Sequence, residues 1–492
     1  MIIVKLNRPE FEYDIHSLVK AFYPSEDVYV SAADKKQSEQ IDYHMDVCYD
    51  DTQIRFTFFQ VMENGEEKQV AKAAADVSYE NRKETKNALK RSLYQMLSDY
   101  TKQKLPWGNL TGIRPTKIPM NLLEEGKSDE EIAQYMRDTY YCSEEKIKLS
   151  IEIAKRELAL LHKLDYENGY SLYIGIPFCP STCLYCSFTS YPLGVWKNRM
   201  DDYLTALEKE IDFTAVKFAH KKLNTIYIGG GTPTTLTAEQ LDRLIRKIKC
   251  SFDLSHLVEF TVEAGRPDSI TAEKLKVLKF HGISRISINP QTMKQATLDL
   301  IGRHHTVEQT IESFKLARSL GFDNINMDLI VGLPQETIED VRDTMEQLRV
   351  LDPDSITVHS LAIKRAARLR MFQDDYKDYK IVNTKDHIDL TARVAGEMGL
   401  EPYYLYRQKN MAGNFENVGY AKPGKAGIYN VLIMEEKQTI MALGAGATTK
   451  FVFENATRME RTENVKDIHN YLDRTDEMID RKMKKMEEIS WH

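Results

Sequence analysis

The 492-residue chain contains only six cysteines and three tryptophans, and it lacks any apolar run long enough to cross a bilayer. Six cysteines, three of them far apart along the chain, argue against a scaffold held together by disulfides. A transmembrane helix needs about 20 consecutive apolar residues, and the first stretch, MIIVKLNRPEFEYD, reaches charge too early for a secretory signal. We therefore expect a cytoplasmic protein without a membrane span, in a compartment that keeps thiols reduced.

The chain also lacks a surplus of basic residues. Its 67 lysines and arginines are outnumbered by 74 aspartates and glutamates, which gives a formal charge of −7. A net negative charge offers no overall attraction to a polyanion, so we expect no nucleic-acid partner, although a local basic pocket is compatible with these numbers. The length exceeds that of one ordinary domain, and two or three domains are expected.

Residues 1–165 have the pattern of an α+β domain, whose role the sequence does not indicate. Ser128 and Glu131 form a capping-box signature before one of its helices. The loop WGNLTGIRPTKI (107–118) is rich in Gly, Asn and Pro and is interpreted as ordered. Four β-like runs precede helical stretches near 82–104, 129–138 and 143–163, and these runs are MIIVKL, VYVSA, YHMDVCY and QIRFTFFQV.

A different rhythm extends over residues 166–370, where short apolar runs alternate with helical stretches. Consecutive βα units predict a parallel sheet, and we expect an α/β fold built on an incomplete (β/α)6 TIM-like barrel. In such a barrel the chemistry gathers at the carboxyl ends of the strands. Residues 371–492 are expected to form a C-terminal extension that completes the substrate site. The six apolar runs are SLYIGIPF, NTIYIGG, VEFTVEA, SRISINP, INMDLIVG and SITVHSL.

Half of the cysteines lie in one short stretch, IPFCPSTCLYCSF (176–188), as Cys179, Cys183 and Cys186. A structural zinc site needs four protein ligands, and this stretch contains no histidine, so zinc would need a distant fourth ligand. A [4Fe–4S] cluster held by three thiolates leaves one iron open to a non-protein ligand such as S-adenosylmethionine. The spacing favours the iron–sulfur interpretation, with zinc and chance clustering as alternatives. Each of the other three cysteines, Cys48, Cys142 and Cys250, is expected to be a small buried hydrophobe.

The residues from Tyr173 through Ile176, Pro177 and Phe178 into Cys179-x3-Cys183-x2-Cys186 resemble the radical S-adenosylmethionine (SAM) enzymes. Four more blocks resemble, in the same order, the oxygen-independent coproporphyrinogen III dehydrogenase family and its relatives, the heme chaperones. The first 165 residues, together with YRQKN…ENVGYAKPG, resemble the HemZ-type branch of that family. The four blocks are GGGTPT (229–234), GISRISINPQ (282–291), GRHH (302–305) and MDLIVGLPQET (327–337).

This resemblance implies a [4Fe–4S] cluster on Cys179, Cys183 and Cys186 that carries one SAM molecule on its open iron. It also implies two sets of cofactor contacts. The first SAM is expected to contact Tyr173, Tyr185, Gly230, Gly231, Thr232, Glu263 and Ala362, and a second SAM to contact Gln291, Arg303 and Asp328.

Three of these positions also have a physical interpretation. Glycines that end a strand let backbone groups approach a ligand closely, which suits Gly230 and Gly231. Asp328 interrupts an apolar strand, and a buried carboxylate without a partner is costly. Its partner is expected to be either Arg303 or a bound cofactor.

The family's substrate carries four propionates, which arginines bind well through two parallel hydrogen bonds. AIKRAARLR (362–370) and YRQK provide Arg365, Arg368 and Arg407 as candidate propionate ligands. A solvated helix face is the alternative interpretation of these basic residues.

Two positions depart from the dehydrogenase pattern. Phe188 stands where those enzymes usually have a further cysteine, and Gly175 stands where they have a histidine. An aromatic residue at position 188 is closer to the heme chaperones.

The resemblance implies that the protein oxidatively decarboxylates coproporphyrinogen III to protoporphyrinogen IX in heme biosynthesis. Its partners would be a flavodoxin- or ferredoxin-type electron donor and an electron acceptor. Two alternatives are a heme-binding chaperone and a radical SAM enzyme that acts on another tetrapyrrole.

Overall fold

The computed structural model describes residues 1–31, 41–362, 367–371, 379–408, 415–453 and 458–488. The chain separates into two compact units, Met1–Lys155 and Arg156–His492. A further boundary near residue 370, between a barrel and a C-terminal extension, stays a prediction. None of the described helices is long and apolar enough to cross a membrane.

The N-terminal unit is built around a sheet with the strand order β2-β1-β3-β4-β5. The pairing is parallel on both sides of β1 and antiparallel from β3 to β5. Helices α1 (Glu12–Phe22) and α2 (Arg82–Thr101) contribute Leu18 and Leu93 to the apolar core of this unit. The strands are β1 (Ile2–Leu6), β2 (Val28–Ser31), β3 (Tyr43–Tyr49), β4 (Gln53–Val61) and β5 (Glu67–Asp76).

Three elements of this unit were not predicted from the sequence: α1, α3 (Lys117–Glu124) and β5. The β5 sequence, EKQVAKAAAD, is rich in residues that favour helices, but pairing with β4 overrides that preference. The predicted helices are present as α2, α4 (Asp129–Tyr140) and α5 (Glu144–Leu161). The predicted capping box at α4 is confirmed, because Ser128 and Glu131 each accept the other's backbone N–H.

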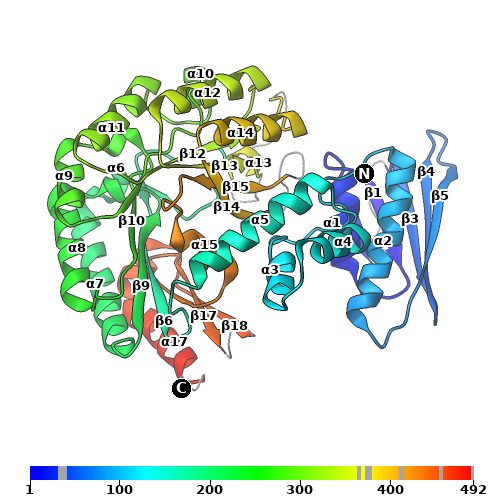
Figure 1. The fold of residues 1–492 in the computed structure, drawn as a ribbon, viewed down its shortest axis with the longest axis horizontal. Helices are drawn as coiled ribbons and strands as arrows, with labels where there is room; N and C mark the ends of the chain where they lie inside the picture. The colour runs from blue at the N-terminus through cyan, green and yellow to red at the C-terminus, as the bar shows by residue number, and fades with distance from the viewer. Residues whose placement is uncertain (32–40, 363–366, 372–378, 409–414, 454–457, 489–492) are drawn as a thin grey trace. The chain divides into compact units, whose positions relative to one another are not determined.

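The C-terminal unit contains the predicted parallel sheet, in which the six predicted strands lie in chain order. Each adjacent pair among them is parallel, and Figure 1 shows helices α7, α8, α9 and α11 on the outer side of the strands. The strands are β6 (Gly169–Ile176), β9 (Lys222–Gly230), β10 (Glu259–Glu263), β11 (Arg285–Ser287), β12 (Ile325–Val331) and β13 (Ser355–Ser360). The intervening helices are α7 (Met200–Lys217), α8 (Ala238–Ser251), α9 (Ala272–Phe280), α10 (Gln295–Leu300), α11 (Val307–Ser319) and α12 (Ile338–Leu351).

Segments after residue 370 extend this sheet at both edges. Strand β16 (Thr439–Leu443) runs parallel to β6, whereas β15 (Asn417–Ala421) runs antiparallel to β13. The described sheet therefore has the order β14-β15-β13-β12-β11-β10-β9-β6-β16-β17-β18 and is not closed into a barrel. The remaining strands are β14 (Glu401–Tyr406), β17 (Thr448–Phe453) and β18 (Arg458–Glu463), and the remaining helices are α6 (Leu193–Trp196), α13 (Arg368–Met371), α14 (Lys385–Glu397), α15 (Ile428–Glu435), α16 (Ile468–Asp473) and α17 (Thr475–Glu487).

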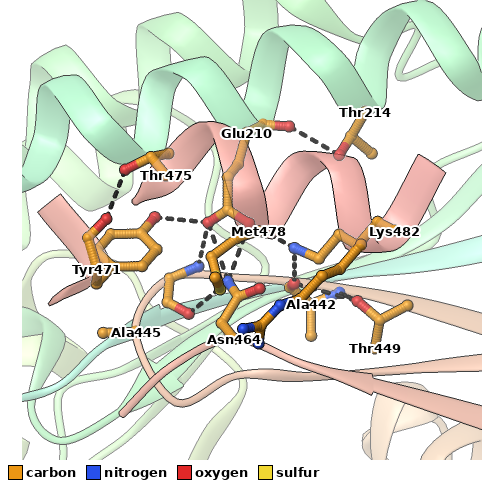
Figure 2. Close-up of polar contacts among 12 residues, drawn as sticks. Glu210, Thr214, Ala442, Ala445, Thr449, Asn464, Tyr471, Thr475, Met478 and Lys482 are labelled. Atoms are coloured by element: carbon orange, nitrogen blue, oxygen red, sulfur yellow. Dashed lines mark hydrogen bonds and ion pairs between the residues drawn. The ribbon is translucent and has the colours of Figure 1, made fainter. Parts of the chain in front are cut away.

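A buried ion pair fixes the last helix to the sheet (Figure 2). The amine of Lys482 on α17 contacts the carboxylate of Glu210 on α7, and both side chains are 0% exposed. Glu210 also accepts hydrogen bonds from the Tyr471 hydroxyl at 2.5 Å and the Asn464 amide at 2.9 Å, while Lys482 donates to the Ala442 carbonyl at 2.7 Å. Since a buried charge is tolerated only when paired and hydrogen-bonded, this network ties α17 to α7 and β16.

Candidate functional site

The three clustered cysteines lie on a loop that leaves the carboxyl end of β6. The loop closes where β7 (Phe178–Cys179) pairs with β8 (Tyr191–Pro192). Within it, the backbone N–H of Cys186 donates to the carbonyl of Cys183 at 3.2 Å, which forms a tight turn between these two residues. None of the three cysteines forms a disulfide among the described residues, and all are partly buried, at the strand end where the sequence predicted the chemistry.

Leu184 anchors this loop to the sheet. Its N–H donates to the carbonyl of Ile301 at 2.9 Å, and its carbonyl accepts from the N–H of Leu369 at 3.0 Å. The Leu184 side chain belongs to a buried cluster that includes Ile330 on β12 and Leu361 just after β13. The cysteine loop leaves β6 but is therefore held over the carboxyl ends of β12 and β13, which lie several strands away in the sheet.

The chemistry of the three thiols fits a metal cluster. Burial raises the pKa of the Cys179 thiol to about 11, although the Thr232 hydroxyl, which donates to Sγ at 3.5 Å, opposes this shift. Such a thiol is protonated at neutral pH, and metal binding must displace the proton. In the described parts of the chain, no three His, Cys, Asp or Glu side chains are placed to share a single metal ion. Three thiols from one loop match the donor set of a [4Fe–4S] cluster with one open iron.

The glycine turn after β9 packs tightly against the residues that lead into the cysteines. A Cβ atom on Gly231 would lie 2.6 Å from the carbonyl oxygen of Phe178, and one on Gly229 would lie 3.1 Å from the Glu263 carboxylate. Gly230 has a φ of +108°, which favours glycine. The sequence interpretation favoured ligand approach as the reason for these glycines, and the chain's own packing requires them as well. Contacts of Gly230 and Gly231 with SAM stay predictions.

Glu263 lies at the end of β10 beside a stack of tyrosines. Tyr227 donates its hydroxyl hydrogen to Oε1 of Glu263, and the ring of Tyr227 stacks on Tyr429 of α15 at 4.5 Å between centroids. The ring of Tyr173, a predicted SAM contact, lies 6.2 Å from Tyr227. Burial raises the pKa of Glu263 to about 7, with the nearby Asp328 adding to the shift and the Tyr227 hydrogen bond opposing it. Glu263 can therefore hold or release a proton near neutral pH.

The structure brings Gln291 and Asp328, two of the residues predicted to contact a second SAM, together. The N–H of Gln291 donates to the Asp328 carbonyl at 2.9 Å, and Gln291 has a positive φ of 68°. Its side-chain oxygen Oε1 is buried and accepts no hydrogen bond from any described residue. A buried acceptor without a donor is costly, so this oxygen is a candidate to receive a ligand's hydrogen bond.

Asp328 is partnered by His359 and Asn326. The imidazole Nε2 of His359 lies 3.8 Å from Oδ2, and the Asn326 amide donates to Oδ1 at 2.7 Å. Burial by itself would raise the pKa of Asp328, but His359 and Asn326 lower it below its usual value. The carboxylate therefore stays ionised within the parallel sheet.

Arg303 is not the partner of Asp328, and that part of the sequence expectation is wrong. Its guanidinium donates to the Gly265 carbonyl at 2.9 Å and to the Tyr185 hydroxyl at 3.5 Å. The loop between α10 and α11 thus directs Arg303 toward the cysteine loop. Its Nε is buried and has no hydrogen-bond acceptor among the described residues. Arg303 and Tyr185, predicted to contact different SAM molecules, are therefore neighbours.

The predicted propionate ligands are less well defined. Arg368 is exposed at the start of α13, Arg407 is buried just after β14, and Arg365 lies outside the described residues. Ala362 follows β13 and is partly buried. Their contacts with substrate or cofactor stay predictions.

Outside the motif, two cysteine predictions are wrong. Cys142 is buried, but Cys48 and Cys250 are exposed. Cys48 occupies an exposed position of β3, and Cys250 lies in the last turn of α8. An alternating strand and an amphipathic helix both have a solvent face, so residue type alone did not predict burial.

Several residues of the site were missed in the sequence. Tyr227 and His359 lie on strands that were predicted, and their position just before the strand ends was an available signal. Tyr429 had no such signal because α15 reaches the site from the C-terminal segment. Arg266 follows β10 and lies 3.6 Å from the sulfur of Cys183, a contact that only folding reveals.

Comparisons with known proteins identify the family of the chain. Residues 173–348 match the model of the radical SAM superfamily, whose members use a [4Fe–4S] cluster and SAM, so these are the cofactors of this chain. The heme chaperone HemW of Bacillus subtilis is 35% identical over 62% of this chain and 75% of its own length. The structure of coproporphyrinogen III oxidase (HemN) from Escherichia coli covers 65% of this chain and 73% of its own, with a TM-score of 0.51 and 23% identity, and so shares the fold.

A more extensive match is the "oxygen-independent coproporphyrinogen-III oxidase-like protein HemZ" of B. subtilis. It is 43% identical over 411 residues, which cover 83% of this chain and 82% of the relative. The match extends well beyond the barrel residues that the superfamily model spans. The chain therefore belongs to the HemZ-type, oxygen-independent coproporphyrinogen-III oxidase-like family of radical SAM proteins.

Proposed function

We propose that this protein catalyses the oxygen-independent oxidative decarboxylation of coproporphyrinogen III to protoporphyrinogen IX. Two propionate side chains become vinyl groups, and each loses one CO₂, one hydrogen atom and one electron. An external one-electron donor reduces the cluster, and a separate acceptor takes the electron that the substrate loses. The family membership supports radical SAM chemistry in heme metabolism, and the site supports this particular reaction.

When bound, the cluster and SAM together supply the radical that removes hydrogen from the propionate carbon next to the pyrrole. The chain's own residues hold and orient the reactants. Glu263 offers carboxylate oxygens to ribose hydroxyls at the end of β10, and Tyr173 and Tyr227 form an aromatic wall beside it. Asp328, ionised and oriented by Asn326, is suited to accept hydrogen bonds from a cationic or hydroxylated ligand.

The observation that carries the proposal is the group formed by Gln291 and Asp328. In the dehydrogenases, by resemblance, these positions contact the second SAM, which suits a reaction that removes two hydrogen atoms from each substrate molecule. Here the two residues are joined through their backbones, and the buried Oε1 of Gln291 is without a donor. A protein that only stores heme has no need for a second cofactor at this place.

The heme chaperone is the second candidate, and two observations favour it. HemW is similar over a large share of the chain, and Phe188 is an exposed aromatic residue directly after the cysteines. A third candidate, oxidation of another tetrapyrrole such as heme itself, uses the same cofactors.

The test is anaerobic incubation of cluster-loaded protein with reductant, SAM and coproporphyrinogen III. Release of CO₂ and formation of vinyl products, together with 5′-deoxyadenosine, are expected. Asp328→Asn should keep the iron and some formation of 5′-deoxyadenosine while vinyl formation falls. Asp212→Asn, which removes an exposed carboxylate on α7 that pairs with Lys247, is the matched control and should behave as the wild type.

Parallel incubations with heme distinguish the candidates. If the cluster-loaded wild type releases no CO₂ from coproporphyrinogen III and retains one heme per protein, the chaperone is favoured. The proposed decarboxylation would then be abandoned. Production of 5′-deoxyadenosine with heme, but not with coproporphyrinogen III, would indicate the third candidate.

A further inference from the structure

Arg266 reaches from the loop after β10 to the cysteine loop. The residue is 4% exposed, and its Nη1 lies 3.6 Å from the sulfur of Cys183 in donor geometry. The same nitrogen donates to the Ser181 carbonyl at 3.3 Å, and Nη2 donates to the Ser181 hydroxyl oxygen at 3.1 Å. The guanidinium therefore spans Cys183 and the residue two places before it.

Asp268 fixes the orientation of this guanidinium. Its two carboxylate oxygens accept from Nε of Arg266 at 3.0 Å and from Nη2 at 2.7 Å, a bidentate pair in which the side chains are 5% and 19% exposed. Burial opposes ionisation of Asp268, but the guanidinium lowers the pKa of this carboxyl below its usual value. The backbone is held as well, because the N–H of Ser269 donates to the Arg266 carbonyl at 2.9 Å.

A further contact links the same group to the next loop. The hydroxyl of Ser181 donates to the carbonyl of Gly302 at 2.8 Å, in the loop between α10 and α11. Arg266 thus belongs to a connection between three loops and is not free to turn away from Cys183. Such a buried, bidentate pair holds an arginine in a defined geometry.

A cationic N–H donor at a cluster thiolate acts on the cluster's electron affinity. Reduction adds negative charge that is partly carried by the sulfurs, so a nearby cation and its hydrogen bond stabilise the reduced state more than the oxidised state. Hydrogen bonds to sulfur and net charge are the means by which proteins set the potential of iron–sulfur clusters.

We propose that Arg266 is a positioning residue that holds Cys183 as a cluster ligand and raises the reduction potential of the [4Fe–4S] cluster. Thr232 acts in the same way on Cys179, more weakly, since its hydroxyl is a neutral donor 3.5 Å from the sulfur. The inference depends on the cluster and not on the proposed decarboxylation. A variant that no longer releases CO₂ therefore neither supports nor contradicts the proposed effect of Arg266 on the reduction potential.

The test is an anaerobic redox titration with dithionite, followed by electron paramagnetic resonance of the reduced cluster. In Arg266→Gln the midpoint potential should become more negative. At the wild-type midpoint the ratio of oxidised to reduced cluster should rise about tenfold, which corresponds to about 59 mV for a one-electron couple. Thr232→Val should shift the midpoint in the same direction and by less.

Two controls separate the local contact from general charge. Arg266→Gln combined with Asp268→Asn keeps the net charge of the wild type, and the negative shift should persist. Arg243→Gln removes an arginine that pairs with Glu208 through two hydrogen bonds between α8 and α7, and it should leave the midpoint unchanged.

An unchanged midpoint in both Arg266 variants, with full iron content, overturns the inference. If Arg266→Gln does not retain iron, the titration is made on Arg266→Lys, which keeps the charge but cannot bridge Ser181 and Cys183 with a planar fork. A negative shift in that variant supports the inference, and an unchanged midpoint overturns it.

Discussion

The hydroxyl of Tyr227 donates a hydrogen bond to Oε1 of Glu263, between the ends of two neighbouring parallel strands. Strand β9 provides the donor and β10 the acceptor, and both side chains face the inside of the sheet beside the ring of Tyr429. This contact joins a titratable carboxyl to the aromatic wall of the proposed cofactor site. Because this carboxyl titrates near neutral pH, it also makes the stability of the protein depend on pH, which can be measured without cofactors.

Burial raises the pKa of Glu263 to about 7 from an ordinary value of 4.5. The folded protein therefore binds this proton more tightly than the unfolded chain does. The resulting stability is fully present below about pH 4.5 and is lost as the pH rises through about 7. Replacement of Glu263 by Gln should remove that loss, which is on the order of 3 kcal/mol.

The measurement is the unfolding free energy of metal-free wild type and Glu263→Gln at pH 5 and pH 8. Relative to the wild type, the unfolding free energy of Glu263→Gln should be higher at pH 8 than at pH 5. Tyr227→Phe removes the donor that opposes the shift, so its loss of stability should extend to a higher pH. If the difference in unfolding free energy between the wild type and Glu263→Gln were the same at both pH values, the raised pKa of Glu263 would be contradicted.

The cysteine loop predicts a selective loss of iron. Cys183→Ala removes one of the three predicted ligand thiolates, so the reconstituted variant should lose most of its iron and the cluster absorbance. Cys250→Ala is the matched control, because Cys250 is an exposed thiol in the same unit. Full iron loading of Cys183→Ala would show that the cluster is held elsewhere.

The packing of the glycine turn predicts a steric effect at Gly231. In Gly231→Ala, the new Cβ would meet the backbone of Phe178 at 2.6 Å, and this backbone cannot move without shifting Cys179. We expect a loss of about 1–3 kcal/mol in unfolding free energy and reduced iron retention. Gly194→Ala is the control, since a Cβ there would meet no described atom within 4 Å apart from its chain neighbours and the backbone of its own helix. Equal melting temperatures and iron contents in the two variants would count against this packing.

The ion pair of Figure 2 predicts a large stability effect from the last helix. Lys482→Ala leaves the Glu210 carboxylate buried without its cation, and the unfolding free energy should fall by about 3–5 kcal/mol. Lys209→Ala removes an exposed amine that lies 3.5 Å from Asp476 and links the same two helices, α7 and α17. Its effect should be much smaller, because exposed ion pairs are screened by water. Chemical denaturation of both variants makes the comparison.

The elements that depend on a local pattern could be predicted from the order of the amino acids. The six parallel strands were predicted because each is a short apolar run bounded by helical segments, which is how a strand covered on both faces is encoded. Cys179, Cys183 and Cys186 were predicted as cluster ligands because their spacing resembles the motif of radical SAM enzymes. Asp328 was recognised because a carboxylate inside an apolar strand is costly unless it has a partner.

Which distant residues meet at the site depends on the folded chain and could not be predicted from local patterns. Strand β16 pairs with β6 across more than half of the chain, and α15 places Tyr429 on Tyr227. The partner of Asp328 proved to be His359 and not Arg303, because the direction of each loop depends on packing that no local pattern encodes. Arg266 shows the same limit. Its sequence position marks only a polar residue after a strand, while its contact with Cys183 arises because parallel strands bring their following loops together at one edge of the sheet.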